Sequence, residues 1–303
     1  ECCGFAMYAL AKDVCDIGMG RRFPTDAEKA AYPELKFKVV GKAPIAVIVN
    51  STLGKYFNET NYTVLWEIFI NRSKVTYVPE LDKWAVDVTE LTGATYGGKD
   101  IYLIPVVYPF SEEHAEYAAG AGEWEGPGVR PKGEVYGTST QGMFSLYLMR
   151  GPSSTAWILG GAEENLELNN KIDDDVADGS LDNYTFANSP EEVIDLVASD
   201  LIENTTGNYV TGYIGFVEYR YAYNVIEEEG DEAKILILGL DGITEYNADP
   251  EDIGTEDVSN KFGGAGYVTG FGGPMFTPVM VFTKGEPDPW EKEFIDFLET
   301  FEG

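Results

Sequence analysis

The stretch "SPEEVIDLVASDLIENTTGNYVTGYIGFVEYRYAYN", residues 189–224, decides the fold class. Ser189 before Pro190 and two glutamates is a helix N-cap pattern, and it predicts a helix over "EEVIDLVASDLIEN". A glycine-containing turn follows, and then an apolar run that is typical of a buried strand. Helix, turn and strand in direct succession indicate a mixed α/β architecture.

Tyrosines are concentrated at the end of this stretch, at Tyr209, Tyr213, Tyr219, Tyr221 and Tyr223. Their spacing is even, so we expect them on one face of a strand. Packing on the face of a sheet is the first interpretation of this pattern, and an aromatic protein interface is the second.

The same alternation of apolar runs and amphipathic segments continues on both sides. Strands are predicted over 43–50, 99–108, 234–242 and 277–285, and helices over 28–32, 61–70, 143–149 and 289–301. In the helix over 61–70, Leu65, Ile68 and Phe69 are expected to face inward. The glycine- and acid-rich segment 112–133 is expected to be a long loop.

Composition narrows the function classes. The chain has 303 residues, 44% of them hydrophobic, which is enough for a sizeable core and for two domains. Its formal net charge is -31, with 52 acidic against 21 basic residues. Nucleic acids and anionic lipid surfaces need clustered Lys and Arg, so we expect neither as a partner. An acidic, solvated surface of the kind found in many archaeal proteins is the simplest interpretation.

Six N-glycosylation sequons predict a glycoprotein on the extracellular or cell-surface side. They begin at Asn50, Asn58, Asn61, Asn71, Asn183 and Asn204. The three cysteines, Cys2, Cys3 and Cys15, leave two alternatives open. One disulfide with one thiol left over would fit an oxidising compartment, whereas small buried hydrophobic side chains would need no bond.

Three segments, in order, resemble the phosphate-binding protein of the phosphate ABC importer. They are "DVCDIGMGRRFPTDAEKAAYPELKFKVVGKAPIAVIVN" (13–50), the stretch 189–224 with its "IGFVEYRYAYN", and "KILILGLDGITEYNADPEDI" followed by "TPVMVFTKGEPDPWEKEFIDFLETFEG". The resemblance implies a type II periplasmic-binding-protein-like fold with two α/β lobes joined by a two-crossing hinge. Lobe one would comprise residues 1–99 and 223–303, and lobe two residues 100–222.

The resemblance also implies an anion site. In that family the "DIGM"-like strand end leads into ligand contacts, which places Gly20, Arg21 and Arg22 here. The family's hydroxyl loop at a helix N-terminus matches Thr138, Ser139 and Thr140. Helix N-termini and arginine are suited to oxyanions. The alternatives are that the arginines pair with surface carboxylates and that the hydroxyls cap the helix.

The match departs from the family in four places. After "DIGM" the family usually has serine, then serine or aspartate, whereas this chain has Gly20 and Arg21 and so lacks the hydroxyl. The family's binding arginine falls near Glu134, an acid. The family's first strand has no counterpart before "ECCGFAMYAL", and its final segment has none after "LETFEG". Either flanking residues complete the lobe, or another subunit supplies the strand. Repeated strand addition of that kind builds filaments.

Other chemistry is poorly supported, and we expect no enzyme, metal or cofactor. His114 is the only histidine, which leaves no Ser-His triad with a spare base and no multi-histidine metal site. The acidic run 173–175 lacks the ligand alternation of a calcium loop. The leading hypothesis is therefore an extracytoplasmic protein that captures phosphate or a related oxyanion and delivers it to the membrane subunits of an ABC importer. The alternative is a cell-surface structural subunit, polymerising with itself by strand exchange, with a degraded ligand pocket.

Overall fold

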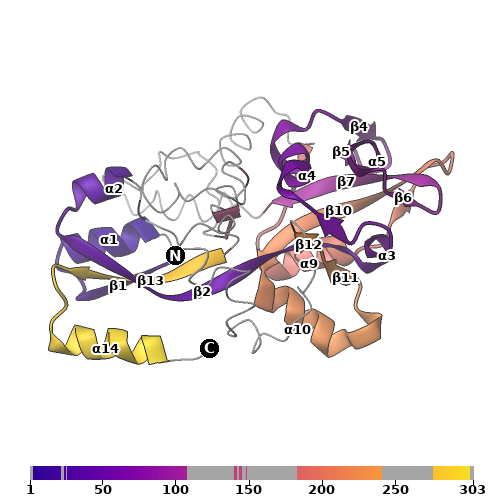
Figure 1. The fold of residues 1–303 in the computed structure, drawn as a ribbon. Coiled ribbons are helices and arrows are strands. Elements are labelled where there is room, and N and C mark those ends of the chain that lie inside the picture. Colours follow the sequence, from indigo (N-terminus) through magenta and orange to yellow (C-terminus); the bar gives the residue numbers. More distant parts are fainter. Residues whose placement is uncertain are drawn as a thin grey trace.

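The strand β2 (Leu35–Asn50) is the longest of the described strands and connects two groups of strands (Figure 1). The computed structural model describes residues 3–21, 24, 26–107, 140–141, 143–144, 148, 183–240 and 276–300. In this part of the chain all but two of the strands belong to one large sheet, whose main order is β1-β13-β2-β10-β7-β5-β4. Helices cover the sheet, and the mixed α/β fold predicted from the sequence is confirmed.

The first group pairs with the N-terminal part of β2. It consists of β13 (Phe276–Lys284), which lies antiparallel to β2, and β1 (Ile17–Gly20), which lies antiparallel to β13. Figure 1 shows α2 (Asp26–Ala31) on one side of these strands and α14 (Pro289–Thr300) on the other. Met7 and Leu10 of α1 (Cys3–Ala11) pack against Met280 and Phe282 of β13.

The second group pairs with the C-terminal part of β2, where residues 45–49 are buried. β10 (Tyr209–Glu218) lies antiparallel to β2 and parallel to β7 (Lys99–Val107), and β5 (Lys83–Asp87) and β4 (Val75–Val78) follow. Strands buried on both faces are rich in apolar residues, and 210–217 fits this pattern, since it is buried except for the half-buried Tyr213. Short strands extend this group: β6 (Thr95–Tyr96), β8 (Thr185–Phe186), β9 (Ile202–Glu203) and β11 (Ile235–Ile237).

The remaining elements lie beside this second group. β3 (Glu59–Thr60) and β12 (Gly239–Leu240) form a separate two-stranded sheet. The helices are α3 (Ser51–Gly54), α4 (Tyr62–Trp66), η1 (Glu67–Asn71, a π-helix), α5 (Val88–Thr92), α9 (Pro190–Ala198), α10 (Tyr219–Glu229) and η5 (Gly230–Glu232). Leu65, Ile68 and Phe69 are fully buried, as predicted.

Helix α9 begins as its sequence predicts. Ser189 accepts a hydrogen bond from the backbone N–H of Glu192 (3.2 Å), and the Glu192 carboxylate accepts one from the backbone N–H of Asn188 (2.7 Å). The prediction that this helix continues to residue 204 is wrong. It ends at Ala198, and residues 202–203 pair with β10 instead, because sheet hydrogen bonds replace those of a further helical turn.

The prediction of one strand face for the five tyrosines is also wrong. Tyr209 and Tyr213 lie in β10, but Tyr219, Tyr221 and Tyr223 lie in α10. The rings of Tyr219 and Tyr223 stack at 5.8 Å, the contact expected for residues four apart in a helix. A spacing of four residues fits both a strand and a helix, so Tyr219 and Tyr223 alone do not distinguish a strand from a helix start.

Strand pairing by itself does not test the predicted lobes. β5 and β7 pair across the predicted boundary at Lys99, and β2 belongs to both groups. The division into residues 1–99 with 223–303 and residues 100–222 therefore stays a prediction.

Candidate functional site

Arg21, Thr140 and Glu218 meet at one carboxylate oxygen. The Arg21 guanidinium forms an ion pair with Glu218 Oε1, and the Thr140 hydroxyl donates a hydrogen bond to the same oxygen at 3.3 Å. Arg21 and Thr140 are 119 residues apart in the chain by their numbers (140 − 21). The fold thus brings two of the residues implied by the family resemblance onto a single acceptor.

Local structure places each of these side chains. Arg21 directly follows Gly20, the last residue of β1. Thr140 lies in helical backbone and is 8% exposed. Glu218 ends β10, where it pairs with Ile45 of β2, and is the N-cap residue of α10. The group around β1, a helical segment and the group around β10 each contribute one residue.

Glu218 occupies an N-cap position without capping its helix. Its side chain makes no hydrogen bond to the first turn of α10. The carboxylate is instead turned toward Arg21 and Thr140, where its side chain is 13% exposed against 46% for Arg21. A carboxylate this far buried needs charged or hydrogen-bonding partners, and the two donors supply them.

A guanidinium and a hydroxyl that point at one oxygen form a donor set for oxyanions. Carboxylate and phosphate oxygens accept hydrogen bonds from the same groups, and arginine adds a positive charge. In this structure, the oxygen at the centre of the donor set belongs to Glu218. Of the two alternatives raised by the sequence, pairing of Arg21 with a carboxylate is the contact seen in the structure. The Thr140 hydroxyl donates its described hydrogen bond to Glu218.

The other predicted contacts are only partly described. Gly20 is buried and pairs with Met280 of β13. Arg22, Thr138 and Ser139 lie outside the described residues, as do His114, Glu134 and the acidic run 173–175. Met143, Phe144 and Leu148 are helical and buried, in agreement with the helix predicted over 143–149. Sequence reasoning missed Glu218, because the change from strand to helix at this residue was not predicted from the sequence.

The sequon asparagines differ in accessibility. Asn58, Asn61 and Asn71 are exposed, and Asn183 and Asn204 are half-buried. Asn50 is only 5% exposed, and its amide donates to the Ser199 carbonyl (2.9 Å) while its Oδ1 accepts from the Thr52 N–H (2.9 Å). Asn50 is therefore inaccessible in the folded protein.

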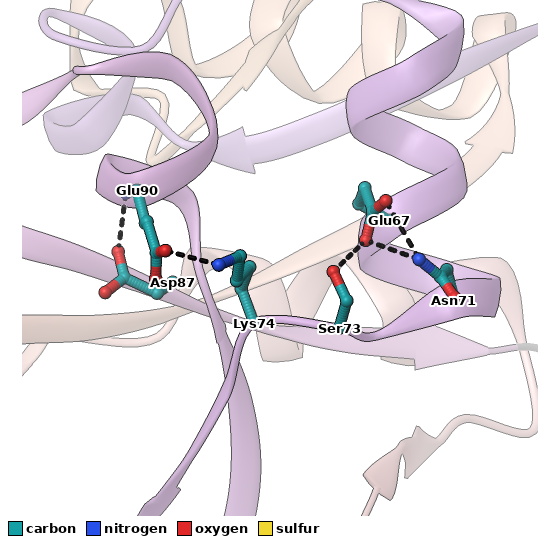
Figure 2. A network of polar contacts seen from close by, with 6 residues as sticks. All are labelled: Glu67, Asn71, Ser73, Lys74, Asp87 and Glu90. Atoms are coloured by element: carbon teal, nitrogen blue, oxygen red, sulfur yellow. Dashed lines mark hydrogen bonds and ion pairs between the residues drawn. The ribbon is translucent and has the colours of Figure 1, made fainter.

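One exposed sequon belongs to a polar network on η1, the loop after it and the start of α5 (Figure 2). Glu67 accepts hydrogen bonds from the Asn71 amide (2.9 Å) and the Ser73 hydroxyl (2.6 Å). Burial raises the pKa of Glu67, but these hydrogen bonds outweigh it and hold the pKa below its usual value. Next to it, Lys74 pairs with Glu90 at 2.5 Å.

The cysteines give no disulfide that the structure describes. Cys15 carries a free thiol, and burial, with a smaller contribution from Asp16, raises its pKa. Cys2 lies outside the described residues, and Cys3 begins α1. Among the described residues, no group of His, Cys, Asp and Glu could hold a metal ion. None of the described helices is long and apolar enough to cross a membrane.

Comparisons with known proteins find similarity among solved structures but not among family models or curated proteins. No protein-family model matches the sequence, and no curated protein matches it. A putative phosphate ABC transporter substrate-binding protein from Clostridium perfringens, solved with bound phosphate, is similar with a TM-score of 0.48 and 15% identity, covering 99% of this chain and 79% of the other. An ABC-type phosphate transport receptor from Vibrio cholerae gives 0.47 and 13%, with the same coverage. PstS from Borrelia burgdorferi gives 0.46 and 16%, covering 96% and 76%.

Proposed function

We propose that this protein is an extracytoplasmic solute-binding protein that captures an oxyanion, with phosphate as the first candidate. The observation that carries the proposal is the convergence of Arg21 and Thr140 on a single carboxylate oxygen. Donors already arranged around one anionic oxygen can accept another of similar chemistry with little rearrangement of their own. The ordered resemblance of three segments to phosphate-binding proteins supports phosphate.

Binding would use the two donors together with the residues adjacent to them. Arg21 supplies charge and up to two parallel N–H donors, and Thr140 supplies a hydroxyl. Gly20, Arg22, Thr138 and Ser139 are the further contacts that the resemblance implies. Arg21 follows β1, and Thr140 lies in a separate helical segment, so an anion held by both would connect them. Closure of two lobes around the anion, and its transfer to the membrane subunits of an ABC importer, complete the proposed mechanism.

Calorimetric titration of phosphate tests this function. The protein is first unfolded and refolded to remove any bound anion. Phosphate is expected to bind, and Arg21→Ala is expected to weaken binding by at least about tenfold, because a charge-assisted contact contributes more than about 1.4 kcal/mol. Arg220→Ala is the matched control, since Arg220 is an exposed arginine two residues after Glu218. No heat with phosphate or sulfate would contradict the proposal.

A second candidate function is a cell-surface structural subunit that exchanges strands with its neighbours. The observation that favours it is the position of β1, which among the described residues pairs only with β13 and so ends the sheet. An open edge accepts a strand from another chain. Electron microscopy of the purified protein at high concentration checks this candidate. Ordered filaments would support it, and a monodisperse monomer would contradict it.

A further inference from the structure

We propose that Glu218 is an internal competitor for the oxyanion site, which an incoming anion must displace before it can contact Arg21 and Thr140. This inference rests on the proposed function and specifies how the same site is regulated. In this proposal Glu218 sets the affinity for the oxyanion, although it is not one of the donors that bind the anion.

The first step is the position of the carboxylate. Both donors contact the same atom, Oε1 of Glu218, rather than one oxygen each. That atom therefore lies where the two donors converge, which is the place that an oxygen of a bound oxyanion would take. Two oxygens cannot occupy one position, so Glu218 and a ligand exclude one another there.

The second step is that capping of α10 does not explain this conformation. An N-cap side chain normally accepts a hydrogen bond from the second or third backbone N–H of its helix. Glu218 makes no such bond. Its carboxylate is held by residues from other parts of the chain, which shows that contact with Arg21 and Thr140 is preferred over the local partners that a helix start offers.

The third step is electrostatic. With Glu218 in place, the positive charge of Arg21 is paired, and a second anion beside the carboxylate would meet repulsion. The backbone of Glu218 is held by pairing with Ile45. Rotation of the side chain alone would therefore move the carboxylate away from the two donors. Apparent affinity then equals the intrinsic affinity multiplied by the fraction of molecules in which Glu218 has turned away.

Glu218→Gln is the decisive substitution. Glutamine keeps the shape of the side chain and can still accept a hydrogen bond, but it carries no charge. Glu228→Gln is the matched control, because Glu228 is an exposed glutamate on the same helix. It removes the same unit of net charge away from the donors.

Titration of inorganic phosphate into wild type and both variants gives the readout. Glu218→Gln is expected to bind phosphate at least about tenfold more tightly than wild type, and Glu228→Gln within about twofold. Acetate, which presents the same carboxylate group, is expected to compete with phosphate in Glu218→Gln more strongly than in wild type.

The possible results separate the inference from the proposed function. If wild type and Glu218→Gln bind phosphate equally well, and Arg21→Ala still weakens binding, the internal competitor is overturned and the proposed function stands. Weaker binding by Glu218→Gln, with an unchanged unfolding temperature, would make Glu218 a ligand contact and also overturn the inference. If neither protein binds phosphate, both proposals fall.

Discussion

The two groups of strands on either side of β2 differ in how much apolar surface they bury. The group around β10 and β7 encloses one continuous core that includes Phe69, Phe144, Tyr184 and Phe216. The group around β1 and β13 has a separate small cluster made of Met7, Leu10, Met280 and Phe282. Burial stabilises in proportion to the apolar area removed from water, so the group around β10 and β7 contributes most of the stability of the described fold. Arg21 belongs to the small group and Glu218 to the large one, and their ion pair connects the two.

Matched leucine truncations test this difference most strongly. Leu103→Ala in β7 is expected to lower the free energy of unfolding by about 4 kcal/mol, because the continuous core cannot collapse around the cavity. Leu10→Ala in α1 is equally buried but is expected to cost about 2 kcal/mol, since fewer neighbours surround it. Urea unfolding measures both values. Equal losses would remove the proposed difference between the groups.

Glycine-to-alanine substitutions in β10 and β2 compare how tightly the two groups of strands are packed. A Cβ on Gly215 of β10 would lie 2.6 Å from Val193 Cγ1 of α9, whereas a Cβ on Gly41 of β2 would lie 3.5 Å from Val279 Cβ. Gly215→Ala is expected to cost about 2 kcal/mol through overpacking. Gly41→Ala is expected to be neutral or slightly stabilising because it restricts the unfolded chain. A tolerated Gly215→Ala would show that α9 can move away from the sheet.

Tyr184→Phe probes the polar interior of the large group. The Tyr184 hydroxyl is buried and donates to the Phe69 carbonyl at 2.7 Å, so its removal leaves that carbonyl without this donor. We expect a loss of about 1.5 kcal/mol by thermal unfolding. The control is Tyr77→Phe, because the Tyr77 hydroxyl donates to Asp82 at the exposed surface. That change is expected to stay below about 0.5 kcal/mol, and a larger loss there would mean that the exposed contact matters as much.

The network in Figure 2 gives a smaller, pH-dependent effect. Because the pKa of Glu67 is lowered on folding, its contribution to stability is complete above its usual pKa of 4.5 and is lost as the pH falls through the lowered value. Glu67→Gln should therefore flatten the loss of stability on acidification over that window. Unfolding temperatures from pH 7 down to pH 3 would show this. Parallel curves for the two proteins would contradict the assignment.

Glycan mapping compares the two groups of strands by surface accessibility rather than by stability. All six sequons lie between residues 50 and 206, outside β1 and β13. If the protein passes through a glycosylating compartment, mass spectrometry should find glycans at Asn58 and Asn71 but none at Asn50, whose side chain is buried and bonded. A glycan at Asn50 would require modification before folding.

Much of the fold could be predicted from the sequence, because it depends on local patterns. The cap at Ser189, the buried strand over 43–50 and the inward face of the helix over 61–70 each follow from a few neighbouring residues. Helix ends were less predictable, since the helix after Ser189 gives way to β9, whose pairing with β10 is a tertiary contact. The change from strand β10 to helix α10 at Glu218 was likewise not predicted, because the apolar and tyrosine pattern continues across it.

The candidate site could be predicted only in part. The family resemblance points to Arg21 and Thr140, but nothing in the sequence indicates that both meet Glu218. That contact depends on the register that sets Glu218 opposite Ile45 and on the place where β1 ends. Such a meeting of three distant segments is a property of the fold as a whole.

The most direct test of the oxyanion site is a crystal structure of the protein grown with phosphate. The result that we expect is a phosphate held by Arg21 and Thr140, with the Glu218 side chain turned away from both. Glu218 still bound to Arg21, with phosphate elsewhere or nowhere on the protein, would contradict the account.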